Sequence, residues 1–141
     1  MQEMSAEEYR SFLLDRARTA SLGTVRADGR PHVIPIWFDL DGDTFVFMAG
    51  ETTVKARNMR RNPRVSLCID DEEPPFHFVL VEGTAEMMAD DPDLLYWATR
   101  IAGRYMGEEL AESYGRRNAV PGEMLVRVRP EKIVARKNIA D

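Results

Sequence analysis

The segment Thr52–Arg64 concentrates the positive charge of this chain. It contains no acid and five cations, which are Lys55, Arg57, Arg60, Arg61 and Arg64. The 141 residues carry 19 Lys and Arg against 24 Asp and Glu, so the segment has a charge of +5 and the remainder a charge of −10. Thr52 and Thr53 precede a helical run, and the free N–H groups and positive dipole of a helix N-terminus attract anions. The pattern predicts a site for one or two phosphates, with a solvated basic helix face as the alternative.

A second unusual feature is the strand-like run Val33–Phe38, which reads VIPIWF. Pro35 cannot donate a ladder hydrogen bond, and it leaves neighbouring backbone groups without strand partners. These groups would face the hydrogen-bonding edge of a planar ring, while Trp37 or Phe38 packs beside it. An edge strand that proline protects against aggregation explains the same pattern equally well.

The chain shows no familiar catalytic constellation of its own. His32 and His77 have no metal-ligating partners at suitable spacing, so no metal site is predicted. Nucleophile elbows, phosphate-binding P-loops and dinucleotide fingerprints do not occur, so a catalytic residue stays unknown and demanding chemistry would come from a bound cofactor. The aromatic set Tyr96, Trp97 and Tyr105 fits a core or a subunit interface better than a substrate pocket.

Composition indicates one globular domain that spans residues 1–141, with 44% apolar residues. The net charge of −5 argues against nucleic acid or an anionic membrane as the main partner. The N-terminus lacks an apolar signal core, and no apolar run reaches membrane-spanning length. The single cysteine, Cys68, excludes an internal disulfide and fits a cytoplasmic protein; its strand context predicts a buried, unreactive thiol.

Turn and cap signals predict the elements that position these residues. Ser5 and Glu8 form a capping box for a helix to about Arg18. Asp28-Gly29 and Asp41-Gly42 predict two hairpins, with the run RPHVIPIWFDL between them as a strand limited by its prolines to an edge or a bulge.

The basic helix stops near Pro63, and RVSLCID and FHFVLVEGTAEMM follow as strands around an acidic turn. Helices follow Asp91-Pro92, with a break near Gly107. MLVRVRP then alternates as a half-buried strand, and KIVARK adds a short one. Six or seven hairpin-connected strands predict a mainly β fold of the α+β type, a closed or nearly closed antiparallel barrel with flanking helices.

Taken in order, RPHVIPIWF, DLDGDTFVF, KARNMRRNPRVSL and VEGTAEM resemble the pyridoxamine 5′-phosphate oxidase-like superfamily of split β-barrel flavoproteins. The resemblance covers residues 12–88 well and MLVRVRPEKIV more loosely. The block Lys55–Val65 followed by VEGTAE is most similar to actinobacterial reductases that use the deazaflavin coenzyme F420. The resemblance implies a split barrel of the FMN-binding type, a homodimer, and two cofactors at the subunit interface.

Carried over by position, the resemblance implies three groups of cofactor-binding residues. The phosphate would be bound by Thr52, Thr53, Lys55, Arg57 and Asn58. The ring would lie along Val33, Ile34, Pro35, Ile36 and Trp37. Ala49 and Gly50 would lie close to the chain that links ring and phosphate.

The implied activity is hydride transfer from reduced F420 to an unsaturated small molecule. Some deazaflavin-binding relatives have an arginine where this chain has Thr53, and FMN is the alternative cofactor. An FMN-dependent oxidoreductase of the same fold, or a non-catalytic protein that binds flavin or haem, remain the rival functions. The Arg-and-His substrate-phosphate signature of pyridoxamine phosphate oxidase itself is not found near the C-terminus.

Overall fold

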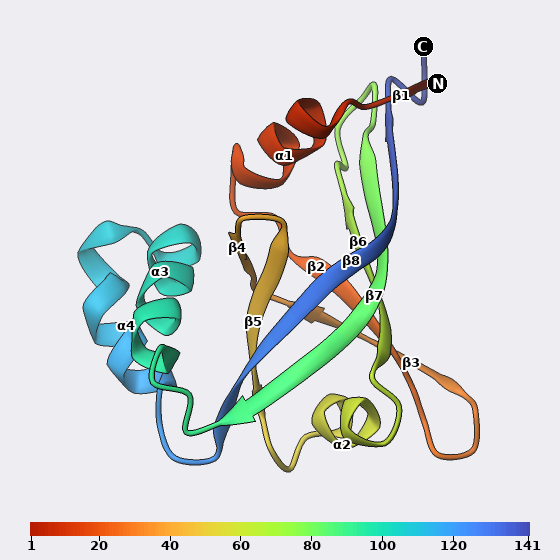
Figure 1. The fold of residues 1–141 in the computed structure, drawn as a ribbon. Coiled ribbons are helices and arrows are strands. Elements are labelled where there is room, and N and C mark those ends of the chain that lie inside the picture. The colour runs from red at the N-terminus through yellow and green to blue at the C-terminus, as the bar shows by residue number, and fades with distance from the viewer.

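A computed structural model describes residues 1–141 and shows one continuous antiparallel sheet with helices around it (Figure 1). The sheet runs in the order β3-β2-β6-β7-β8-β5-β4, with β1 added to β8. Its strands are β1 (Gln2–Glu3), β2 (Ala20–Val25), β3 (Pro31–Ile36), β4 (Asp39–Asp41), β5 (Thr44–Gly50), β6 (Arg64–Asp70), β7 (Phe78–Ala89) and β8 (Glu123–Lys137). The mainly β, split-barrel fold expected from the sequence is confirmed.

The run RPHVIPIWFDL forms two strands instead of one. The first strand, β3, ends at Ile36, and the second, β4, begins at Asp39. Because β3 and β4 are the two ends of the sheet order, this short connection joins opposite edges and curls the sheet into a barrel. The edge position predicted for the proline-bearing strand is confirmed. Both hairpins are also confirmed, with Gly29 and Gly42 at positive φ in their turns.

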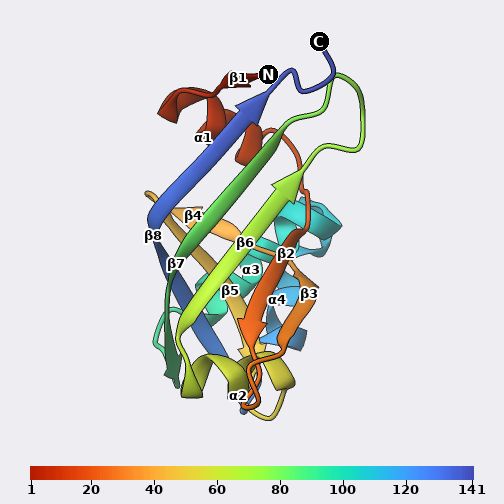
Figure 2. The same cartoon turned by 90° about the vertical axis from the view of Figure 1, so that its right-hand side faces the viewer.

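The predicted strands MLVRVRP and KIVARK are one continuous strand, β8, which spans 15 residues. Pro130 lies opposite Gly83, at a register shift that leaves Glu131 without a partner on β7. A bulge tolerates a residue that cannot donate a hydrogen bond, so the proline does not end the strand. Long β7 and β8 lie side by side with β6, β2 and β3 in Figure 2. The structure has eight strands because two short ones, β1 and β4, join the expected set.

The barrel interior is filled by a cluster of 22 buried residues, with Phe38, Phe45 and Phe47 among its largest side chains. A smaller cluster lies on the outer side of β5 and β8, where Val46 and Leu125 pack against Trp97. Alternate residues of β5 therefore meet apolar partners on both faces, which explains its continuous apolar run.

Four α-helices surround the barrel: α1 (Ala6–Leu14), α2 (Val54–Arg61), α3 (Leu94–Met106) and α4 (Ala111–Asn118). The Ser5–Glu8 capping box begins α1 as expected, but α1 ends at Leu14 and not near Arg18. Gly107, at φ 93°, separates α3 from the short 3-10 turn η1 (Glu108–Leu110) that leads into α4. Figure 1 shows α3 and α4 together beside β5, and α2 at the opposite end of the barrel from α1.

Cys68 differs from its predicted placement. Val65, Leu67 and Ile69 of β6 face the core, so Cys68 lies on the outer face and is half-buried. Burial, together with the charge of Asp70, raises the pKa of its thiol, which disfavours the reactive thiolate. Among the helices, none combines the length and the apolar character that crossing a bilayer demands.

Candidate functional site

The open seam of the split barrel holds the first part of the candidate site. β3 pairs only with β2, and residues 47–50 of β5 pair only with β8, so each presents one free edge. A cavity of about 290 Å³, here called the seam pocket, lies where these edges approach α2, α3 and α4. It is lined by Pro35, Ile36, Trp37, Met48, Lys55, Ile101, Asn118 and Glu123.

Trp37, at the point where the chain leaves β3, is fixed by Tyr105 of α3. The two rings are stacked, with centroids 4.7 Å apart and an interplanar angle of 1°. The Tyr105 hydroxyl donates to the backbone oxygen of Arg18 at 2.7 Å and accepts from the N–H of Phe38 at 3.1 Å. Burial raises the pKa of this hydroxyl, which keeps it a neutral donor. Tyr105 thus holds the aromatic wall of the seam pocket in place.

The polar end of the seam pocket is formed where β5 meets the start of α2. Thr53 is the N-cap: its hydroxyl accepts from the N–H of Ala56 and donates to the oxygen of Gly50 at 2.7 Å. The first turn of a helix has N–H groups without helical partners, and Lys55 of this turn in α2 lines the seam pocket. A cation next to a capped helix N-terminus has the donor chemistry of a phosphate site.

Glu123 is the one carboxyl in the lining of the seam pocket. It begins β8 directly opposite Gly50 and is half-buried. Burial raises the pKa of Glu123, and the charge of Lys55 opposes part of that rise. The lining of the seam pocket therefore contains one cation, Lys55, and one acid, Glu123.

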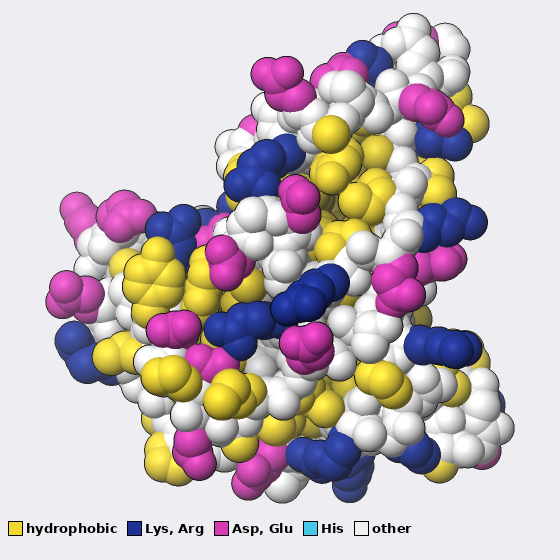
Figure 3. Space-filling view, viewed as in Figure 1, with side chains coloured by type: hydrophobic (Ala, Val, Ile, Leu, Met, Phe, Trp, Pro, Cys, Tyr) yellow, Lys and Arg dark blue, Asp and Glu magenta, His cyan; other side chains and the backbone are white.

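The remaining cations of the basic segment lie elsewhere around α2. Arg57 and Arg61 face a second cavity of about 380 Å³, together with Arg26 and Arg30 of the β2–β3 hairpin. We call this the arginine pocket; it is lined by Arg26, Ala27, Asp28, Arg30, Val54, Arg57, Asn58 and Arg61. Asp28 is its only acid and is paired with Arg30 at 2.7 Å. Figure 3 shows Lys and Arg side chains gathered at the end of the molecule where α2 lies.

Asn58 is used within the protein. Its side-chain N–H donates to the Thr24 hydroxyl at 3.0 Å, and its oxygen accepts from Arg61 at 3.0 Å. Asn58 is buried and links α2 to β2. Its predicted phosphate contact stays a prediction, but the structure gives Asn58 a positioning role for Arg61.

The other predicted residues lie around the two cavities. Val33 and Pro35 are exposed on the outer side of β3, whereas Ile34 turns inward and packs on the core. Ala49 is buried in the core, and Thr52 is exposed in the turn before α2. The sequence predicts one part of the site on a strand and the other at the start of a helix. Residues from both parts line the seam pocket: Pro35, Ile36, Trp37 and Lys55.

Four residues of the seam pocket were not among those expected: Met48, Ile101, Asn118 and Glu123. Met48 alternates with buried Phe47 and Ala49, so the strand period alone places it on the outer face. Ile101, Asn118 and Glu123 come from elements whose packing against β5 has no local sequence signal.

The aromatic residues of α3 divide between two environments. Trp97 is buried against Val46 and Leu125, in agreement with the expected core role, and Tyr96 is exposed. Tyr105 instead supports Trp37 in the seam pocket wall, so its role is in the site. Figure 3 shows apolar side chains over α3 and α4 on the face turned toward the viewer.

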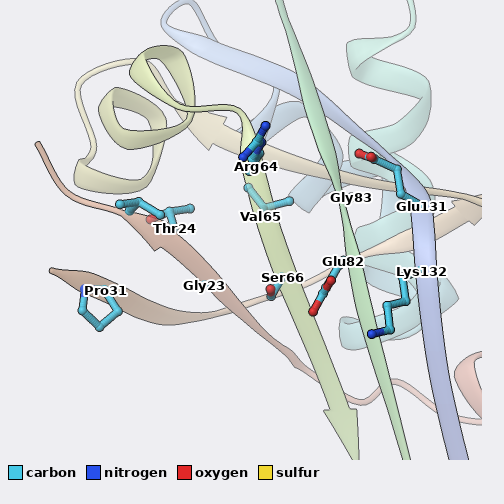
Figure 4. A pocket seen from close by; sticks show the side chains of 11 residues that line it. Gly23, Thr24, Pro31, Arg64, Val65, Ser66, Glu82, Gly83, Glu131 and Lys132 are labelled. Carbon is cyan, nitrogen blue, oxygen red and sulfur yellow. The ribbon is translucent and has the colours of Figure 1, made fainter. Parts of the chain in front are cut away.

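Arg64, the last cation of the basic segment, lies apart from both cavities described above. It lines a hollow of about 420 Å³ on the outer face of β2, β6, β7 and β8. Figure 4 shows Arg64, Ser66, Glu82 and Lys132 on adjacent strands around this hollow. Glu131, the bulge residue of β8, accepts a hydrogen bond from Thr84 at its rim. Two acids balance the two cations here, so the hollow lacks the positive excess of the arginine pocket.

The histidines show no shared site. The ring nitrogen Nδ1 of His77 accepts from the N–H of Asn138 at 3.1 Å, and the ring packs edge-on against Phe12. His32 lies on β3 and pairs across the ladder with Thr24. The structure contains no group of three or more His, Cys, Asp or Glu residues arranged to hold a metal ion.

The sequence of this barrel matches a known protein family. The family model described as pyridoxamine 5′-phosphate oxidase matches residues 5–137. The chain belongs to the pyridoxamine 5′-phosphate oxidase family. This is a family of flavin-binding oxidoreductases, and its split barrel is the fold described above.

Individual relatives carry different names within this family. A pyridoxine/pyridoxamine 5′-phosphate oxidase from Cupriavidus pinatubonensis is 30% identical over 87% of this chain, but the match spans only 57% of that protein. A protein named heme oxygenase HutZ, from Vibrio cholerae, is 28% identical over 89% of this chain and 72% of its own length. A solved structure named F420 reductase is 29% identical, with a TM-score of 0.69 and coverage of 87% of this chain and 94% of its own.

Proposed function

We propose that this protein is an oxidoreductase that binds coenzyme F420 with its ring along β3 and its phosphate at the start of α2. The free edge of β3 supplies unpaired backbone groups beside an aromatic wall, and Lys55 lies next to the capped helix N-terminus. These features match a planar, hydrogen-bonding ring joined to an anion. A family relationship to flavin-binding oxidoreductases and the likeness to an F420 reductase support the proposal.

The observation that favours F420 over FMN is the division of cations between two sides of α2. Lys55 faces the seam pocket, whereas Arg57 and Arg61 face the arginine pocket with Arg26 and Arg30. FMN ends in a single phosphate, which would use only the cation and helix N-terminus of the seam pocket and none of the cations of the arginine pocket. F420 carries a phosphate followed by a tail of several carboxylates, and the arginine pocket offers it a second anionic binding surface beyond the phosphate.

When bound in its reduced form, F420 supplies the hydride that would reduce an unsaturated, conjugated acceptor. The chain's own residues would bind the cofactor and orient its ring. Tyr105 holds Trp37 as a ring wall, Met48 and Ile101 exclude water from the seam pocket, and Lys55 neutralises the phosphate.

A titration of the apo-protein with three ligands tests this proposal. F420, F420 without its glutamate tail, and FMN are followed by fluorescence at low and high salt. We expect F420 to bind most tightly, the tailless form to lose affinity and most of the salt dependence, and FMN to bind more weakly than F420. Steady-state oxidation of reduced F420 by conjugated enones then separates an enzyme from a binder. Stoichiometric FMN that F420 cannot displace would overturn the choice of cofactor.

A non-catalytic binder of haem or flavin is the second candidate, favoured by the relationship to the protein named heme oxygenase HutZ. The same apo-protein titrated with haemin discriminates the two. A Soret band that resists competition by F420 supports the haem-binding function, and its absence leaves the reductase.

We also propose a cytoplasmic homodimer with its cofactor sites at the subunit interface. Val33 and Trp37 are 66% and 39% exposed beside the seam pocket, and Leu95 and Tyr96 add further exposed apolar area on α3. A second subunit that covers such surface would also enclose the exposed side of a bound ring. The lone cysteine is in keeping with a reducing compartment.

A further inference from the structure

The polar end of the seam pocket contains a carboxyl where an anion is expected to bind. A Cβ atom built on Gly50 would lie 3.6 Å from Oε1 of Glu123 and 3.4 Å from Cγ2 of Thr53. The carboxyl therefore reaches the turn that begins α2, across Gly50 from the N-cap. Glu123 and Lys55 line the same pocket.

The Glu123 carboxyl is not neutralised by a close partner within the chain. The ion pairs of the structure join other acids, and Lys55 acts on Glu123 only through its charge. The half-buried position at the start of β8 limits how far the side chain can swing away into water. A phosphate bound beside Lys55 would therefore share the seam pocket with an acidic side chain.

Phosphate esters differ in how strongly they would be repelled by this group. A monoester such as FMN carries close to two negative charges at neutral pH, because its second pKa is about 6. A diester, in which two oxygens are esterified, carries only one. The attraction of a single lysine can balance one charge, whereas the second charge of a monoester is left against the carboxylate.

We propose that Glu123 is a specificity-determining residue of the seam pocket, which admits phosphodiester monoanions and disfavours phosphomonoester dianions. The inference rests on the proposed binding of the cofactor phosphate beside Lys55. It assigns the preference for F420, whose phosphate is a diester, to one carboxyl on β8 in addition to the cations of the arginine pocket.

The test compares Glu123→Gln with the wild type by fluorescence titration of F420, FMN and riboflavin at pH 7.5. Glutamine keeps the size and one acceptor oxygen, replaces the other oxygen with an N–H donor, and removes the charge. We expect FMN to bind about ten-fold more tightly, F420 to change by less than about three-fold, and riboflavin, which lacks a phosphate, to be unaffected. Glu109→Gln, at an exposed position on η1, is the control for the same change in net charge.

A second measurement uses the wild type alone and does not depend on folding of the variant. Riboflavin 4′,5′-cyclic phosphate has the same ring as FMN but a diester phosphate, and it should bind more tightly than FMN. An unchanged FMN-to-F420 affinity ratio in Glu123→Gln, an equal gain for riboflavin, or a wild type that prefers FMN to the cyclic diester would each overturn the inference. If the wild type binds F420 in those cases, the proposed function survives; a wild type that binds neither F420 nor FMN overturns both.

Discussion

Trp37 and Tyr105 lie far apart in the sequence, yet their rings stack with centroids 4.7 Å apart. The contact joins α3 to the short connection between β3 and β4, which is the segment that closes the barrel. The hydroxyl of the same tyrosine binds backbone groups of two further segments, at Arg18 and Phe38. One side chain therefore couples closure of the fold to the wall of the seam pocket.

Tyr105→Phe should lower the free energy of unfolding by about 1–3 kcal/mol, because it leaves the N–H of Phe38 and the oxygen of Arg18 without their partner. Ring stacking on Trp37 is kept, so cofactor affinity should change little. Tyr105→Ala should weaken binding as well. Urea denaturation and ligand titration measure the two effects, and Tyr96→Phe, at an exposed position, is the control. Equal stability of Tyr105→Phe and wild type would contradict the assigned hydrogen bonds.

Lys55→Ala and Arg57→Ala should separate the two anion sites. Lys55→Ala removes the cation of the seam pocket and should weaken F420 and FMN alike by about ten-fold or more. Arg57→Ala removes a cation of the arginine pocket and should weaken F420 while leaving its tailless form nearly unchanged.

Arg116→Ala, on the exposed face of α4, is the matched control for loss of one positive charge. Titrations at two salt concentrations give the result. If neither Lys55→Ala nor Arg57→Ala changes any affinity, the basic segment does not bind the cofactor.

Asp91→Asn should destabilise the protein in a pH-dependent way. The hydrogen bond from Arg127, 2.7 Å long, holds the pKa of buried Asp91 below its ordinary value of 3.8. A depressed pKa contributes stability that is complete above the ordinary value and is lost as the pH falls through the folded-state pKa. At pH 7 the free energy of unfolding of the wild type should be about 1.5–3 kcal/mol larger than that of Asp91→Asn.

Below pH 3.8 this difference should shrink as Asp91 becomes protonated. Urea denaturation of both proteins from pH 7 to pH 3 measures it. Asp43→Asn, at a largely exposed position, should show no such gap at any pH. A gap that stays constant down to pH 3 would show that Asp91 contributes through packing and not through its charge.

The protein should be a dimer at micromolar concentration. Light scattering should return about twice the chain mass of 16.1 kDa. Val33→Asp, which places a charge on the exposed edge of β3, should shift the protein toward the monomer and weaken cofactor binding in parallel. Glu112→Asp on α4 serves as a surface control. A wild-type mass of one chain would remove the support for a site between subunits.

Local sequence patterns predicted correctly those features that depend only on interactions between residues close together in the chain. The Ser5–Glu8 capping box, the glycine turns at Gly29 and Gly42, and the N-cap Thr53 all lie where nearest neighbours decide the backbone. The +5 charge of the basic segment and the proline-bearing edge strand are likewise visible in the sequence. Together they indicated an antiparallel barrel and both halves of the seam pocket, and the resemblance of the basic block and VEGTAE to a known family implied the split-barrel type.

Contacts between distant elements were decided only by tertiary packing. The curl of the sheet brings β3 to β5, docks Tyr105 on Trp37, and sets Glu123 across from Gly50. Which face of α2 each cation occupies depends on how the helix is pinned by Asn58 to Thr24, a pair 34 positions apart. The sequence determined that the chain would form a barrel with helices around it, and it predicted an anion site at the start of the basic helix. The division of its cations and the carboxyl beside Lys55 follow from long-range packing, for which no local pattern exists.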